Sequence, residues 1–171
     1  MKTKAVRLYG KSDLRLEEFE LPKIKDDEIL AKVISDSLCM SSYKSSKQGE
    51  DHKRVPDDVA NNPTMIGHEF CGTIVEVGSK WADKFAVGEN FSIQPAFNYK
   101  GSLEAPGYSY PNIGGDATYV IIPAEAMIMD CLLKYDSDVF FYGSLADPVS
   151  CIVGAFHASY HTKQGSYVHE M

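Results

Sequence analysis

Three short segments of the chain carry side chains that bind first-row metal ions. Cys39 lies in DSLCMSS, His68 and Glu69 lie in IGHEFCG, and Asp147 lies in LADPVSC. Zinc accepts this mixture of thiolate, imidazole and carboxylate, and a catalytic zinc usually has three protein ligands and one open position. A short zinc finger has closely paired ligands, whereas only a folded domain can bring these distant segments together. The pattern therefore favours the metal site of an enzyme.

Most of the elements predicted to position these side chains are β-strands. Apolar and polar residues nearly alternate in LRLEEFEL, EILAKVIS, GTIVEVG, ENFSI and ATYVIIP, as in half-buried strands. The Ser- and Lys-rich stretch after Cys39 predicts a short helix, and residues 47–64 and 98–116 read as loops. The apolar run 145–162 predicts a helix with Asp147 in its first turn. The fold class is therefore mainly β with few helices, and the strands allow a barrel.

Composition limits the function further. The 171 residues suggest one domain, residues 1–171, and the net charge of −7 argues against a nucleic-acid partner. No apolar run approaches the roughly 20 residues of a membrane span, and the N-terminus lacks the apolar stretch of a signal peptide. The four cysteines form no CxxC pair, so they read as reduced thiols of a cytoplasmic protein.

The same segments resemble the zinc-dependent medium-chain alcohol and polyol dehydrogenases. The resemblance rests on Cys39 followed by Ser41 and on GHEFCGTIVEVG, VGENFSI, GGDATYVIIPAEAMI and LADPVSCIVGAFHA, which occur in the family's order. It is strongest to the sorbitol and sugar-phosphate branch, which includes reductases of L-sorbose 1-phosphate. The resemblance implies a GroES-like, partly open β-barrel.

The resemblance also implies an activity. A zinc ion would act as Lewis acid while NAD or NADP carries the hydride. The substrate would be an alcohol, a polyol or a sugar phosphate, and the full-length enzyme would be a homo-oligomer. The family's cofactor lies on a Rossmann domain with a G-x-G-x-x-G turn, which this sequence lacks. We therefore expect a fragment without the Rossmann domain, which is inactive alone and binds no nicotinamide by itself.

The resemblance also implies roles for individual residues of the site. Cys39 and His68 are implied as metal ligands, and Glu69 either binds the metal or lies beside it. Asp147 matches an acidic ligand position at which glutamate is usual, and Cys151, four residues later on the same helix face, is the alternative ligand. Ser41 matches the hydroxyl that passes the substrate's proton towards solvent.

The sequence departs from the family pattern at several places. Ser42 stands where aspartate is usual and Lys44 where histidine is frequent, so the standard proton relay is in question. Lys44 and Lys47 either bind an anionic substrate or form a solvated face.

Residues 92–116 lack the four cysteines of a structural zinc site, so no second metal is expected. His157 and His161 are spaced i, i+4, and we expect them to form a polar helix face.

Two alternative functions remain at this level. One is a zinc-free reductase of the quinone-reductase type, which lacks this ligand set. The other is a non-catalytic GroES-like module for assembly or regulation, which has no need of these ligands. Metal analysis of single substitutions separates both from a zinc enzyme.

Overall fold

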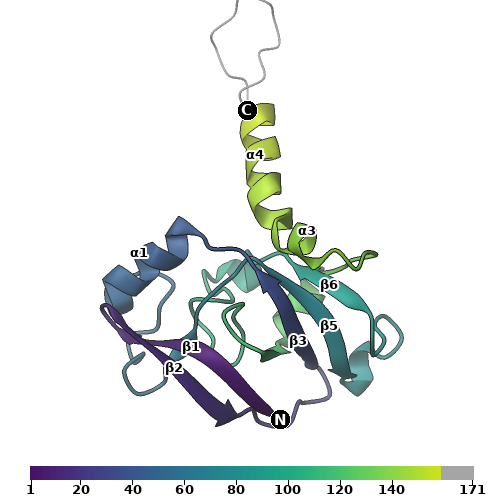
Figure 1. Ribbon diagram of the computed structural model, residues 1–171, viewed down its shortest axis with the longest axis horizontal. Helices are drawn as coiled ribbons and strands as arrows, with labels where there is room; N and C mark the ends of the chain where they lie inside the picture. Colours follow the sequence, from purple (N-terminus) through teal and green to yellow (C-terminus); the bar gives the residue numbers. More distant parts are fainter. Residues whose placement is uncertain (159–171) are drawn as a thin grey trace, which may run out of the picture.

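A computed structural model describes residues 1–158, and two antiparallel sheets form its body (Figure 1). The smaller sheet has the order β2–β1–β4, from Asp13–Glu20, Lys2–Gly10 and Thr64–Met65. The larger sheet has the order β7–β3–β5–β6–β8, from Tyr119–Ile122, Ile29–Asp36, Phe70–Val77, Asn90–Ile93 and Leu132–Lys134. A single bridge between Ala5 and Ala117 links the first sheet to the segment before β7.

The predicted fold class is confirmed. The described part of the chain is mainly β, and its two sheets do not close into one barrel. Every strand pair within it is antiparallel, so these residues contain no parallel sheet of the Rossmann type. The five predicted strands are present as β2, β3, β5, β6 and β7, whereas β1, β4 and β8 were not predicted.

The hydrophobic core lies largely on the five-stranded sheet. Phe70 and Phe91, from the neighbouring strands β5 and β6, meet edge to face with ring centroids 6.1 Å apart. Both are about 1% exposed and belong to one large apolar cluster. Such aromatic pairs contribute about 0.5–1.5 kcal/mol beyond area burial. The packed strands give the loops at their ends a rigid base.

The helices are α1 (Met40–Gln48), α2 (Ala124–Ile128), α3 (Phe140–Ser144) and α4 (Ala146–Ala158), with 3₁₀ turns at Gly49–Asp51, Ser79–Trp81 and Tyr99–Gly101. The predicted helix after Cys39 is α1, and the helix predicted over 145–162 is α4. Residues 159–162, with His161, lie outside the described residues, as does the side chain of His157. Helix α4 extends away from the sheets (Figure 1). No helix in residues 1–158 is both long and apolar enough to span a bilayer.

Two glycines bring the loops of the site together. Gly67 has φ +85°, and a Cβ there would strike the Asp36 carboxylate and the backbone of Asp116. Gly107 has φ +77°, and a Cβ there would strike the backbone of Gly67. Because L side chains rarely adopt such φ values, glycine is needed at both positions. The close approach places the loop at residue 107 against the segment before β5.

Candidate metal centre

Sheet register brings Cys39 together with His68 and Glu69. Cys39 directly precedes α1, just beyond the end of β3, and its φ and ψ are −103° and 140°. His68 and Glu69 directly precede β5, the hydrogen-bonded neighbour of β3. The pairing continues past the strand ends, where the Ser37 N–H donates to the Glu69 carbonyl at 3.0 Å. The two strands thus deliver a thiol, an imidazole and a carboxylate to one place.

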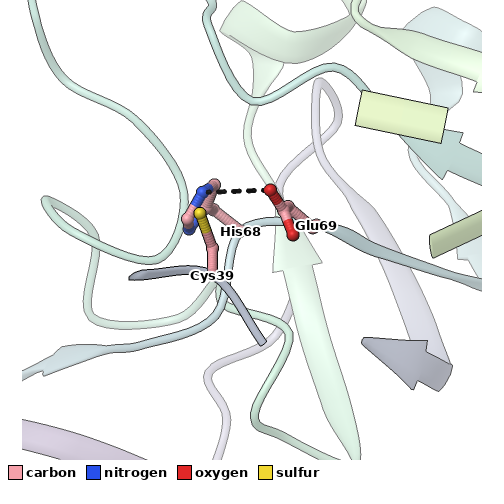
Figure 2. A group of neighbouring side chains, drawn as sticks. All are labelled: Cys39, His68 and Glu69. Carbon is pink, nitrogen blue, oxygen red and sulfur yellow. Dashed lines mark ion pairs between the residues drawn. The ribbon is translucent and has the colours of Figure 1, made fainter. Parts of the chain in front are cut away.

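The three side chains form a compact donor group (Figure 2). Their potential ligand atoms all lie within 4.8 Å of one another, and His68 Nε2 is 3.8 Å from Glu69 Oε1. His68 and Glu69 are each only 6% exposed, and Cys39 is half-buried. Zinc bonds of about 2.0–2.3 Å span a group of nearly this size. A buried set with these donor chemistries fits a divalent zinc ion, with Cys39 still accessible from one side.

Neighbouring hydroxyl groups orient two of these donors. Ser42 Oγ lies 3.2 Å from His68 Nδ1, so the ring is fixed through one nitrogen while Nε2 faces Glu69. Burial lowers the pKa of His68, which favours the neutral imidazole that a metal needs. Ser37 Oγ donates to Glu69 Oε2. Ser42, which stands where the family pattern usually has aspartate, therefore contacts the His68 ring.

Ser41 lies at the mouth of the donor group. Its Oγ is 2.9 Å from Cys39 Sγ and 3.2 Å from His68 Nε2. The Tyr108 hydroxyl donates to Ser41 Oγ at 2.8 Å and lies 3.4 Å from His68 Nε2. A chain of two hydroxyls can both accept and donate a proton. Burial raises the pKa of Tyr108, so its hydroxyl stays protonated at neutral pH.

Sequence reasoning missed Tyr108. The residue lies in the glycine- and proline-rich stretch predicted as a loop, and no spacing relates it to His68. Its ring centroid is 4.9 Å from that of His68 and 5.5 Å from that of His52, on which it stacks nearly parallel. The only available signal was an unusual concentration of aromatic residues in a stretch without cysteine.

Asp147 lies outside the compact group. It is half-buried at the start of α4, and burial raises its pKa, with the Glu69 charge as the next cause. The two carboxylates are thus electrostatic neighbours, but among residues 1–158 the donor group contains Cys39, His68 and Glu69 alone. Cys151 is exposed, one turn further along α4. Asp147 and Cys151 therefore stay predictions as ligands.

The two lysines singled out in the sequence are both exposed on α1. Lys47 reaches the Ser12 hydroxyl at 3.5 Å and lies over the Tyr43 ring at 5.6 Å. Lys44 acts electrostatically on His52 and so on the surroundings of Tyr108. Of the two, only Lys44 is among the charges that lower the pKa of His52, after burial as the largest cause.

The stretch 92–116 is expected to hold no metal. It contains neither cysteine nor histidine, and the donors that zinc prefers are missing. Elemental analysis of the zinc-saturated chain should give one zinc per chain and not two. A second tightly bound ion that is lost on altering this stretch alone would contradict the expectation.

A comparison with protein families identifies the domain that holds this site. Residues 25–131 match the model of the alcohol dehydrogenase GroES-like domain. The match covers more than half of the chain, so the chain belongs to the alcohol dehydrogenase GroES-like domain family.

Two curated relatives match nearly the whole of this chain. The chain is 57% identical to L-sorbose 1-phosphate reductase of Klebsiella pneumoniae over 99% of its own length and 41% of the relative's. It is 49% identical to mannitol-1-phosphate 5-dehydrogenase of Aliivibrio fischeri over 99% of its length and 40% of the relative's. The chain thus spans about two fifths of the length of these curated relatives.

A solved structure supports the fold. A protein of Sinorhizobium meliloti, described as a zinc-binding dehydrogenase and bound to NADP, aligns with a TM-score of 0.71 and 25% identity. The alignment covers 92% of this chain and 45% of that one. The likeness supports the fold assigned from the family match.

Proposed function

We propose that this chain is the catalytic, zinc-binding part of an NAD- or NADP-dependent dehydrogenase that acts on a polyol or sugar phosphate, with L-sorbose 1-phosphate as the leading candidate. The observation that carries the proposal is the compact group of Cys39, His68 and Glu69. The names of the two relatives described above support the phosphorylated substrate. Asp147 is retained as a further candidate ligand because its carboxylate neighbours that of Glu69.

In this proposal each residue has a defined task. Cys39, His68 and Glu69 would hold a zinc ion, which would supply Lewis acidity to the substrate's alcohol or carbonyl oxygen. Ser41 orients the substrate oxygen and accepts or donates its proton at Oγ, which already lies between Cys39 Sγ and the Tyr108 hydroxyl. The Tyr108 hydroxyl is the next group in this chain that can donate and accept a proton.

Cobalt substitution tests the function without requiring turnover. Cobalt(II) bound by Cys39 should give a thiolate-to-cobalt charge-transfer band, and a polyol or sugar phosphate that enters the site should change the visible spectrum. Cys39→Ser is the variant that should remove the thiolate band. A chain that binds no metal would instead favour the zinc-free reductase, and a metal-loaded chain that no sugar perturbs would favour a non-catalytic module.

The 171-residue chain alone should not turn over substrate. Its sequence has no dinucleotide-binding fingerprint, and hydride transfer requires a positioned nicotinamide. The purified zinc-loaded chain with NAD or NADP and L-sorbose 1-phosphate should show no nicotinamide absorbance change above a metal-free control. Turnover above that control would show that these residues suffice.

The partners and location follow from the same proposal. The nicotinamide would be held mainly by residues beyond this chain, and the whole enzyme would form a homo-oligomer. Cys39, Cys71, Cys131 and Cys151 are all free thiols, which suits the reducing cytoplasm. The oligomeric state is measured by sedimentation of the whole enzyme.

A further inference from the structure

Three cations lie near His52, which stacks on the Tyr108 ring, in a chain whose net charge is −7. Lys44, Arg54 and Lys53 all act on His52, whose pKa is lowered first by its burial and then by these charges. None of the three forms an ion pair with a carboxylate in the described part of the chain. They therefore create a local positive potential on an acidic protein, which attracts an anionic ligand.

Arg54 lies closest to the chemistry. Its guanidinium is over the Tyr108 ring, with Cζ 5.7 Å from the ring centroid. The hydroxyl of the same tyrosine is 2.8 Å from Ser41 Oγ. Its positive charge also helps to lower the pKa of His68, although burial is the largest cause. The Tyr108 ring thus contacts the cation on one side and the donor group, through Ser41 and His68, on the other.

The backbone of Arg54 is fixed, but its side chain keeps free donors. The Arg54 N–H donates to His52 Nδ1 at 3.3 Å, and Ser109 Oγ donates to the Arg54 carbonyl at 2.6 Å. The guanidinium makes one hydrogen bond within residues 1–158, from Nη1 to the Leu103 carbonyl at 3.1 Å. Since a guanidinium has five N–H donors, several remain for a ligand.

A small cavity adjoins this side chain. It has a volume of about 250 Å³, and Arg54, Lys53, Ser102 and Ser109 are among its lining residues. Whole-ligand pockets usually measure about 300–1,000 Å³, so this cavity suits one group of a ligand. Glu104 also lines it but is exposed and forms no ion pair with either cation among the described residues.

We propose that Arg54, assisted by Lys53 and Lys44, binds the phosphate group of a sugar phosphate whose reacting carbon lies at the metal centre. The inference rests on the proposed function and specifies its substrate class. A guanidinium can hold a phosphate through two parallel N–H···O bonds, whereas lysine offers a point charge. Arg54 therefore discriminates between phosphorylated and neutral sugars. The metal centre binds the reacting alcohol or carbonyl oxygen, which both kinds of sugar have.

Calorimetric titration of the zinc-loaded chain with L-sorbose 1-phosphate and with L-sorbose tests the assignment. Arg54→Gln should weaken binding of the phosphorylated sugar about 10- to 100-fold, the range typical of charge-assisted hydrogen bonds, and leave binding of L-sorbose unchanged. Glu104→Gln should tighten binding of the phosphorylated sugar alone, because it removes the nearby negative charge. Lys100→Gln, an exposed cation outside this cavity, is the matched control and should change neither affinity.

The outcomes separate this inference from the proposed function. If Arg54→Gln weakened the binding of both sugars equally, the phosphate role would be overturned, because the residue would then support the site as a whole. Equal wild-type affinity for the two sugars would also overturn it, while a cobalt spectrum that responds to both would leave the dehydrogenase proposal standing. A cobalt-loaded chain that responds to neither sugar would overturn both. Unchanged thermal melting of the variants confirms that they fold.

Discussion

Replacing Cys39 by alanine is expected to abolish tight zinc binding, and replacing His68 by alanine should do the same. Cys39 supplies the only thiol of the donor group in the described residues, and His68 supplies its imidazole. Altering residues that merely support a metal ligand already costs about 10- to 100-fold in affinity. Loss of a ligand itself should therefore weaken binding by at least about 100-fold, as measured by competition with a chromophoric chelator.

Matched controls make this expectation specific. Cys151→Ala removes an exposed thiol on α4, and His52→Ala removes the other histidine that contacts Tyr108. Both should keep zinc. Asp147→Asn should weaken binding less than Cys39→Ala, since its carboxylate lies outside the compact group. Full zinc retention by both Cys39→Ala and His68→Ala would contradict the assigned centre, and loss of zinc in Cys151→Ala would give Cys151 the ligand position predicted for Asp147.

The second large effect concerns the stability of the fold near neutral pH. Burial, followed by the neighbouring Asp116 charge, raises the pKa of Asp36 to about 8. Both of its carboxylate oxygens are buried without a hydrogen-bond donor within residues 1–158. In the protonated form its hydroxyl can donate to the Asp116 carboxylate, which stabilises the neutral acid. The folded chain thus holds a proton that an unfolded aspartate, with a pKa of about 3.9, has lost.

The sign of the pH dependence follows from that proton. Because the folded pKa is raised, the stabilisation is complete below pH ~4 and is lost as pH rises towards 8. The free energy of unfolding should fall by up to about 1.4 kcal/mol per pH unit in this window. Asp36→Asn carries no titrating proton, so its slope should be smaller. The variant should be more stable than the wild type by a few kcal/mol at pH 8 and similar to it at pH 4.

Urea unfolding of the metal-free chain at several pH values measures this difference without a contribution from bound metal. Asp83→Asn changes an exposed aspartate and should shift stability by less than about 0.5 kcal/mol. Parallel slopes for wild type and Asp36→Asn would show that Asp36 is ionised in the folded chain at neutral pH.

The sequence alone was enough to predict the class of fold and the chemistry of the centre. Alternating segments such as EILAKVIS and GTIVEVG became β3 and β5 because a two-residue period suits a sheet with one buried face. A thiol and an imidazole can bind a metal in any fold, so Cys39 and His68 could be named as candidate ligands from the sequence. The short segments around them identified the family, which the match over residues 25–131 confirmed.

Only the tertiary structure decided which donors meet and what surrounds them. The antiparallel register that pairs Asp36 with Phe70 brings Cys39 to His68 and Glu69, whereas Asp147 enters from α4 and remains outside the compact group. Tyr108 and Arg54 come from loops whose path depends on close backbone contacts, such as that of Gly107 with Gly67. A local pattern encodes the period of an element, but contacts between distant loops depend on how the whole core packs. The residues assigned here to proton transfer and phosphate recognition are of this second kind.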